Sequence, residues 1–285
     1  MAHPLLPVPG TRPSDVAAAA PAAGPGNWAG APSVVAHDGG FVVAFRLRSA
    51  EGRGGETVVA TSPDGVHLTP VARLPKARFG AESLERPALV RRDDGGWRLY
   101  VSAATPGSKH WRIDALDADD PAGFAQAEAV TVLPGDARTG VKDPVVRRRA
   151  DGWHAWICCH PLDAAGEEDR MTTAHATSPD GLVWTWTATV LAPRPGAWDA
   201  RGTRVTAVLP DGRAFYDGRA SKEENFRERT GVAIPADGRL AAVADGPVAD
   251  VRYLDVVTLP GGGTRLFYEA PLPDGSHELH TELHG

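Results

Sequence analysis

Five glycine-rich hairpin signals recur along the chain at nearly regular intervals, and they limit the possible folds more than any other feature. The turns are Asp38-Gly39-Gly40, Asp94-Gly95-Gly96, Asp151-Gly152, Asp211-Gly212 and Gly261-Gly262-Gly263, each lying between a short apolar run and an alternating or aromatic one. Asp-Gly and Gly-Gly at such places are strong β-hairpin signals. The last glycines, at 40, 96, 152, 212 and 263, are 51 to 60 residues apart. This period, with about four strands in each unit, predicts a propeller.

A second repeat supports this interpretation, because Ala60 to Gly65 recurs as Ala176 to Gly181 with the same six residues. We therefore predict an all-β, single-domain, five-bladed β-propeller, with four-stranded antiparallel blades around a central funnel, over residues 27–285. The expected blades are approximately 27–80, 81–136, 137–193, 194–247 and 248–285. The Ala/Pro/Gly-rich segment 1–26 is expected to be an N-terminal arm, either partly disordered or closing the last blade, which has too few residues of its own for four strands.

Composition narrows the function classes. The 285 residues carry a net charge of −6 with both signs interspersed, and no apolar run approaches transmembrane length, so we expect neither a nucleic-acid nor a membrane partner. The start of the chain has no signal-peptide pattern, and the adjacent Cys158 and Cys159 suit two thiols in a reducing compartment; both favour a cytoplasmic protein. No cofactor motif is present, an axial metal ion stays open, and the oligomeric state is not indicated.

The first strand of every propeller blade lines the axis, so residues at the starts of these strands converge on one pocket. The expected axial groups include four carboxylates, four cations and three aromatic rings. The carboxylates, proposed as catalytic, are Asp143, Asp199, Glu85 and Asp255; the proposed substrate-binding residues are Trp28, Arg86, Lys142, Trp198, Arg201, Arg252 and Tyr253. Carboxylate pairs across a pocket are what glycoside hydrolysis needs, and cations hold a carboxylate ionised or bind a charged substrate.

Asp143 is the most informative of these residues. Pro144 pushes it into extended geometry at the entrance of a strand, and alignment on the hairpin glycines matches Asp143-Pro144 with Ala31-Pro32, Arg86-Pro87, Thr203-Arg204 and Leu254-Asp255. Each candidate also has a structural alternative. Asp143 could cap the strand entry, Glu85 could pair with Arg86, and Asp255 could pair with Arg252. Asp199 could be an ordinary loop residue, and Trp28 and Trp198 could be core residues rather than sugar platforms.

The run Lys142-Asp143-Pro144-Val145 resembles the Arg-Asp-Pro and Ile-Asp-Pro motifs on the third blade of five-bladed glycosidases. These are glycoside hydrolase families 43, 32, 68 and 62 and, more loosely, the mannoside phosphorylases of family 130. The run from Ser178 to Trp184 is also similar to a pattern common in that superfamily. The resemblance implies that Asp143 stabilises the transition state and tunes the pKa of the catalytic acid without attacking the sugar.

The chain departs from this resemblance at two places. Where the families have a first-blade Asp before Pro, this chain has Gly30-Ala31-Pro32, and where they have a fourth-blade Glu it offers Asp199. Glu85 or Asp255 could substitute for the missing group, or hydrolysis could have been lost. The expected function is therefore a glycoside hydrolase-like protein acting on small oligosaccharides or glycosides from the chain end, furanosides included. The alternatives are a catalytically silent carbohydrate-binding propeller, or a phosphorylase that binds phosphate through Arg201, Arg86 or Arg252.

Overall fold

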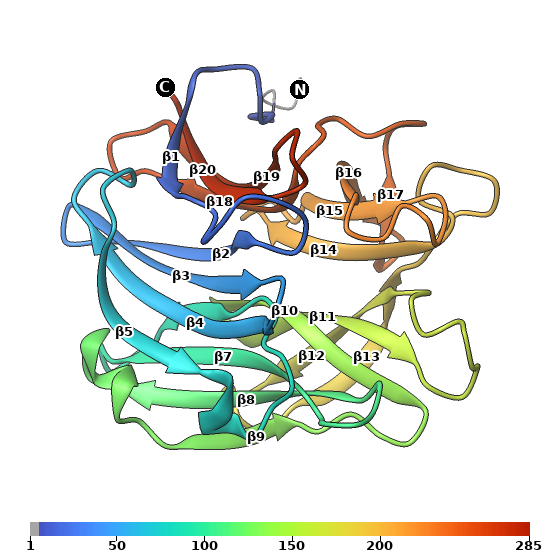
Figure 1. Ribbon diagram of the computed structural model, residues 1–285, viewed down its shortest axis with the longest axis horizontal. Coiled ribbons are helices and arrows are strands. Elements are labelled where there is room, and N and C mark those ends of the chain that lie inside the picture. Colours follow the sequence, from blue (N-terminus) through green and yellow to red (C-terminus); the bar gives the residue numbers. More distant parts are fainter. Residues whose placement is uncertain (1–5) are drawn as a thin grey trace.

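Five antiparallel blades surround a central axis in the computed structural model, which describes residues 6–285. The colours of Figure 1 run around this ring in chain order, from the blue first blade to the red fifth. The prediction of an all-β, five-bladed propeller is confirmed. Residues 1–5 of the expected arm lie outside the described residues. No helix in the described part of the chain is long and apolar enough to cross a membrane.

The blades follow one another along the sequence without interruption. Blade one consists of β2 (Trp28–His37), β3 (Gly40–Ser49), β4 (Arg53–Ser62) and β5 (Thr69–Pro75); blade two of β6 (Ala88–Arg91), β7 (Trp97–Ala104), β8 (Trp111–Ala118) and β9 (Ala129–Leu133). Blade three consists of β10 (Thr139–Arg149), β11 (Gly152–Pro161), β12 (Thr172–Ser178) and β13 (Thr185–Leu191); blade four of β14 (Gly202–Val208), β15 (Ala214–Arg219), β16 (Arg229–Ala236) and β17 (Arg239–Ala242). Blade two also has two 3₁₀ turns: Lys76–Phe79 comes before β6, and Ala122–Ala125 lies between β8 and β9.

Blade five takes its fourth strand from the other end of the chain. Its strands β18 (Arg252–Thr258), β19 (Thr264–Pro271) and β20 (His277–His284) are followed by β1 (Ser14–Ala18), which pairs antiparallel with β20. In Figure 1, β1 lies beside β20 near the C-terminus. A single parallel bridge between Trp28 and His277 also links blade five to blade one. We keep the division into an arm of 1–26 and a propeller of 27–285 as a proposal, since β1 belongs to the arm in sequence and to blade five in space.

The hairpin turns form where the sequence indicates them. Asp38 and Gly39 both have positive φ, 49° and 78°, as a two-residue turn between right-twisted strands requires. Glycine adopts this conformation without steric cost, and Asp tolerates it better than most residues. The turn after β12 is anchored differently, since Tyr100 of blade two donates a hydrogen bond to the carbonyl of Gly181 at 2.8 Å. The second copy of the Ser-Pro-Asp-Gly turn thus ties blade three to blade two.

The inner strands of blades one, three and five share a bulge at their entrance. The register shifts after Gly30, Lys142 and Arg252, and the next residues, Ala31, Asp143 and Tyr253, have φ of 54°, 50° and 54°. The extended geometry expected of Asp143 before Pro144 is therefore wrong, because the bulge sets its backbone in the left-handed region. A bulge inserts one extra residue and re-aims the side chains around it. In blade five the counterpart of Asp143 is therefore Tyr253. The sequence alignment that matched Asp143 with Leu254 was wrong by one residue, because it assumed equal spacing from the hairpin glycine.

Apolar faces of adjacent blades pack against each other and make the core. Between blades one and two, for example, Val42 and Leu74 contact Leu99 and Leu116, all at most 2% exposed. Similar clusters lie between the other blades. The packed faces thus position the first strands rigidly around the centre.

Candidate functional site

A cavity of about 520 Å³ opens at the end of the axis where the inner strands begin, and we name it the axial pocket. Its wall contains eight cationic side chains against four carboxylates. The cations are Arg48, Arg53, Lys109, Lys142, Arg204, Arg219, Lys222 and Arg252, and the carboxylates are Glu85, Glu168, Asp169 and Glu228. Trp111, His160, Phe226 and Tyr253 add aromatic surface. The pocket lining thus has an excess of positive side chains in a chain whose net charge is −6.

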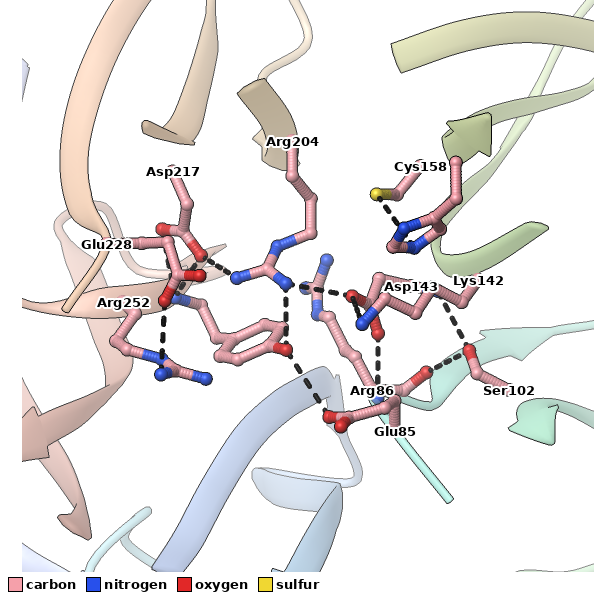
Figure 2. Close-up of polar contacts among 12 residues, drawn as sticks. Glu85, Arg86, Ser102, Lys142, Asp143, Cys158, Arg204, Asp217, Glu228 and Arg252 are labelled. Atoms are coloured by element: carbon pink, nitrogen blue, oxygen red, sulfur yellow. Dashed lines mark hydrogen bonds and ion pairs between the residues drawn. The ribbon is translucent and has the colours of Figure 1, made fainter. Parts of the chain in front are cut away.

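Asp143 lies directly behind the pocket wall and is fully buried. Its Oδ2 is 2.9 Å from Nη1 of Arg204 and 3.6 Å from Nζ of Lys142, and its Oδ1 accepts a hydrogen bond from the backbone N–H of Arg86 at 3.0 Å (Figure 2). Burial alone would raise the pKa of Asp143, but Lys142 and Arg204 lower it to about 2. Asp143 is consequently an anion at neutral pH that holds two pocket cations in place.

Arg204 connects three groups from three blades. Besides Asp143, it donates from Nη2 to Asp217 at 2.5 Å and from Nη1 to the hydroxyl of Tyr253 at 2.8 Å, with its guanidinium 3.8 Å from the centre of that ring. Figure 2 shows it lying between Asp217 and Asp143. Burial raises the pKa of Asp217 despite the neighbouring Arg204. This geometry fixes the orientation of the buried Tyr253 hydroxyl.

A second ion-pair cluster forms the opposite wall. Arg46 pairs with Glu85 and, through Nη2 at 2.9 Å, with Glu269. Glycine is required at position 30, because a Cβ there would lie 2.3 Å from the Glu269 carboxylate. Arg252 lies 3.1 Å from Glu228 and 3.2 Å from Glu269, and these anions, with Tyr253, raise its pKa despite burial. The cluster thus keeps a permanent guanidinium charge at the pocket.

Several buried arginine N–H groups of this site have no acceptor within the described residues. Nε and Nη1 of Arg252 are near carboxylates without hydrogen-bond geometry, and the Nε atoms of Arg46, Arg204 and Arg219 are also unpartnered. Buried polar groups are nearly always hydrogen-bonded, so such donors call for an explanation. An anionic ligand could accept hydrogen bonds from such positively charged donors.

Lys142 and His160 bring further groups to the wall. The Lys142 ammonium lies 4.9 Å from the centre of the Trp111 ring, and burial lowers its pKa in spite of Asp143. His160 donates from Nδ1 to the carbonyl of Glu168 at 2.8 Å, and burial lowers its pKa to about 3. The Cys158 thiol lies 3.9 Å from Nε2 of His160, and burial raises the pKa of Cys158. The two side chains are therefore a neutral thiol beside a neutral imidazole.

The structure brings together part of the set expected from the sequence. Glu85, Lys142, Arg252 and Tyr253 line the axial pocket, and Asp143 lies just behind it. Arg86 and Asp255 are deeper on the axis and fully enclosed. Arg86 donates from Nε to the carbonyl of Pro32, while Asp255 accepts from the Val34 N–H at 2.8 Å and pairs with Arg147 at 3.2 Å. These two residues link blades across the axis below the pocket.

The other expected residues lie elsewhere, which corrects the sequence interpretation. Asp199 accepts hydrogen bonds from Arg194 and from the Tyr216 hydroxyl at 2.9 Å, and Trp198 stacks on Tyr216 in the contact of blades three and four. Arg201 pairs with Asp169 and Glu167. Trp28 is 4% exposed and stacks on His277. The loop before β14 turns Trp198, Asp199 and Arg201 away from the pocket lining, whereas Trp28, at the start of β2, lies behind the lining residues Arg48 and Phe226.

Sequence reasoning missed residues that come from second strands. Arg46 on β3, Asp217 on β15 and Glu269 on β19 are directly paired in register with Gly30, Arg204 and Arg252 of the inner strands. Glu228, which reaches the pocket from blade four, was also missed. A signal was present, because Arg46, Asp217 and Glu269 each put a charge directly after an apolar or aromatic run, residues 42–45, 214–216 and 266–268. A charge at such a position must find a partner in the interior.

Fold and site together define a five-bladed propeller with a polar, charge-dense axial pocket. Comparison with solved structures places the same fold in glycoside-processing proteins. A thermostable family-43 glycoside hydrolase has a TM-score of 0.70 at 13% identity, over 94% of this chain and 91% of that one. An α-L-arabinofuranosidase from Lactobacillus brevis has 0.67 at 16%, over 90% of both chains. The β-1,2-mannobiose phosphorylase from Listeria innocua has 0.63 at 16%, over 90% and 89%.

The sequence itself has diverged from described relatives. No family model matches the chain, and no curated protein matches it in sequence. At identities of 13 to 16%, these likenesses establish the shared propeller fold. The particular reaction has to be argued from the pocket.

Proposed function

We propose that the protein cleaves a glycosidic bond of a small carbohydrate in the axial pocket and transfers the glycosyl group to phosphate. The observation that carries this proposal is the excess of eight cationic over four acidic side chains around the pocket. Arginine and lysine are the usual phosphate ligands, and a neutral sugar alone would not need this charge. The fold shared with a mannobiose phosphorylase supports the same interpretation.

The pocket-lining cations Arg252, Arg204 and Lys142 are the proposed phosphate ligands. Asp143 is proposed as a positioning residue, since it holds Lys142 and Arg204 and is itself fully buried. This assignment keeps the sequence-derived roles of Lys142 and Arg252 in ligand binding. It replaces the expected direct role of Asp199, which lies outside the pocket lining.

Phosphorolysis breaks the glycosidic C–O bond while a phosphate oxygen bonds to the anomeric carbon, and the leaving oxygen must receive a proton. The pocket carboxylates Glu85 and Glu228 are paired with arginines; despite burial, Arg252 and its neighbours lower the pKa of Glu228 to about 2. Burial raises the pKa of Tyr253 to about 12, so its hydroxyl remains protonated. We therefore assign Tyr253 as the proton donor. The attacking HPO₄²⁻ loses its proton as its oxygen bonds to the anomeric carbon, and Glu85, 3.4 Å from the hydroxyl, would pass this proton on to the Tyr253 phenolate, which Arg204 stabilises until then.

The pocket dimensions favour a short substrate. A cavity of about 520 Å³ suits one or two sugar rings, so we propose action at a chain end. Trp111 and Phe226 offer apolar surface for a sugar face. Mannosides and arabinofuranosides are the first substrates to test, because the neighbouring structures are named for them. We also propose a cytoplasmic location, which the free thiols of Cys158 and Cys159 fit.

A panel of 4-nitrophenyl mannosides, arabinofuranosides and other glycosides, assayed with and without phosphate, tests the proposal. Wild type should release nitrophenol only with phosphate. Tyr253→Phe should lower kcat by about 100-fold or more on a disaccharide such as mannobiose, whose leaving hydroxyl needs the proton, and far less on the nitrophenyl glycosides. Asp114→Asn is the matched control, because it removes a buried, arginine-paired carboxylate of blade two outside the pocket. Release without phosphate would indicate hydrolysis and contradict the phosphate role.

Binding without turnover is the second candidate. It is favoured by the arginine pairing of Glu85 and Glu228 and by Ala31, which occupies the first-blade position where the resembled families have Asp. Under this alternative no glycoside in the panel is cleaved, while a sugar phosphate still binds in calorimetry and the Arg252→Met variant loses that binding.

A further inference from the structure

A second cavity, of about 640 Å³, opens at the opposite end of the axis, where the inner strands end, and we name it the distal cavity. All five blades contribute to its wall through the last residues of β2, β6, β10, β14 and β18 or the residues directly after them. Of the residues that the structure describes, none lines both the distal cavity and the axial pocket. The distal cavity is therefore a separate site, with a volume usual for small-molecule pockets.

The wall of the distal cavity is mostly apolar. Each blade supplies at least one valine to it: Val34, Val90, Val146, Val208 and Val256. Further valine, leucine, alanine and proline residues fill most of the remaining wall, and Thr258 is the one uncharged polar residue in the described lining. Such a wall favours a ligand with an apolar body, because its burial removes apolar surface from water on both sides.

The charged residues in the described lining of the distal cavity are all arginines: Arg91, Arg147, Arg148 and Arg149. Two of them have carboxylate partners outside the lining, since Arg147 is 3.2 Å from Asp255 and Arg148 is 2.9 Å from Asp93. The cavity thus combines an apolar wall with charged groups of one sign.

Arg91 and Arg149 have no such partner. Within residues 6–285 neither guanidinium forms a hydrogen bond or an ion pair, and each lies over an aromatic ring instead. Arg91 is 4.6 Å from the centre of the Trp97 ring, and Arg149 is 5.2 Å from the centre of the Trp156 ring. A guanidinium has five N–H donors, and stacking on a ring leaves them available to an acceptor in the cavity.

Arg147 is only partly neutralised, because its partner Asp255 also acts on Arg86. Burial lowers the pKa of Arg86, and Asp255 opposes this effect more than any other carboxylate does. Arg86 is 1% exposed, and its Nη1 has no hydrogen-bond acceptor among the described residues. One carboxylate therefore serves two guanidinium groups, which leaves Arg147 able to attract a further anion at the cavity wall.

We propose that the distal cavity binds a small organic carboxylate with an apolar body. The apolar body would lie against the valines, and the carboxylate would accept hydrogen bonds from Arg91 or Arg149, which suit the two oxygens of this group. A neutral apolar molecule would leave these donors unused, and an inorganic anion would leave the apolar wall in contact with water. The site is independent of glycoside cleavage in the axial pocket.

Calorimetric titration of the full chain with sodium octanoate and with sodium 4-phenylbutyrate at about pH 7.5 tests the proposal. Wild type should bind one equivalent of either carboxylate. Acetate keeps the charge but has hardly any apolar body, and 1-octanol keeps the apolar chain without the charge. Both should bind at least about tenfold more weakly than octanoate, because each lacks one of the two interactions.

Arg91→Met and Arg149→Met should each raise the Kd of octanoate by about tenfold, since each removes a charged hydrogen-bond donor. Methionine keeps an unbranched side chain over the tryptophan ring, and neither arginine has an ion pair to lose, so both variants should keep the Tm of wild type. The matched control is Arg92→Met, because Arg92 follows Arg91 but pairs with Asp94 and Asp117 and lies outside the described lining.

A second control excludes binding in the axial pocket. Arg252→Met removes a cation from that pocket and should leave the Kd of octanoate unchanged. Four results would overturn the proposal: no binding of either carboxylate by wild type, equal affinities for octanoate and acetate, equal affinities for octanoate and 1-octanol, or a loss of affinity in Arg92→Met or Arg252→Met as large as that in Arg91→Met.

Discussion

Replacing Asp143 by Asn removes the negative charge between Lys142 and Arg204 while preserving the size of the side chain. The amide oxygen can still accept the hydrogen bond from the Arg86 backbone. Arg204 keeps Asp217 as a partner, whereas the ammonium of Lys142 loses its ion-pair partner, Asp143. The variant should therefore fold with lower stability, mainly because a buried ammonium is left unpaired.

The magnitude follows from the pKa of Asp143. A shift from the ordinary aspartate value of 3.8 to about 2 in the folded state corresponds to about 2 kcal/mol of stability at neutral pH. The folded pKa is depressed, so this contribution is present above about pH 5 and is lost as the pH falls toward about 2. Half of it should remain near pH 3. The difference between wild type and Asp143→Asn should narrow accordingly on acidification.

Urea unfolding followed by tryptophan fluorescence at pH 7, 4 and 3 measures this difference. A double-mutant cycle adds Lys142→Met, which removes the uncompensated charge and should restore at least about 1 kcal/mol in the Asp143→Asn background. Additive effects of the two substitutions, or a stability difference that stays constant between pH 7 and pH 3, would refute the argument that Asp143 acts by holding these cations.

Two further predictions concern the fold. Removing residues 1–20 deletes β1 and leaves the edge of β20 unpaired, so the truncated chain should have a lower Tm and aggregate with rising concentration in light scattering; an unchanged Tm would show that β1 adds nothing. Gly54→Ala should lower the free energy of unfolding by about 2 kcal/mol, because its Cβ would lie 1.9 Å from the Leu84 carbonyl. The control Gly246→Ala meets nothing within 4 Å and should change stability by less than about 0.5 kcal/mol. An equal decrease in the free energy of unfolding in the two glycine variants would contradict the argument that the Gly54→Ala side chain clashes with Leu84.

The blade architecture could be predicted because its signals are local. A turn such as Asp38-Gly39 needs positive φ, and residues that tolerate it are visible in the sequence. The repeat of these turns then gives the number of blades without any knowledge of long-range contacts. Lys142, Arg252 and Tyr253 could be placed at the pocket for the same reason, since each lies at a predicted strand entrance.

The rest of the site depends on register and bulges, which the sequence does not specify. Tyr253 replaces Leu254 as the counterpart of Asp143 because one bulge residue separates two paired segments of β18. Asp199 has the right residue type for a fourth-blade acid, but its loop turns it toward Tyr216, a direction that no local pattern encodes. Glu228 reaches the pocket on a loop whose Phe226 packs on the ring of Trp28, a long-range contact that the local sequence does not specify.

The pairing of β1 with β20 has a consequence for how the protein is made. More than 250 residues separate Val16 from its partner His280, and a ribosome adds about 5–20 residues per second, so β1 waits on the order of tens of seconds for its partner strand. During that time blades one to four can form, while blade five cannot. The waiting strand, Ser14–Ala18, is short, carries Asp15 and has only one β-branched residue, so it is a poor template for pairing with other nascent chains.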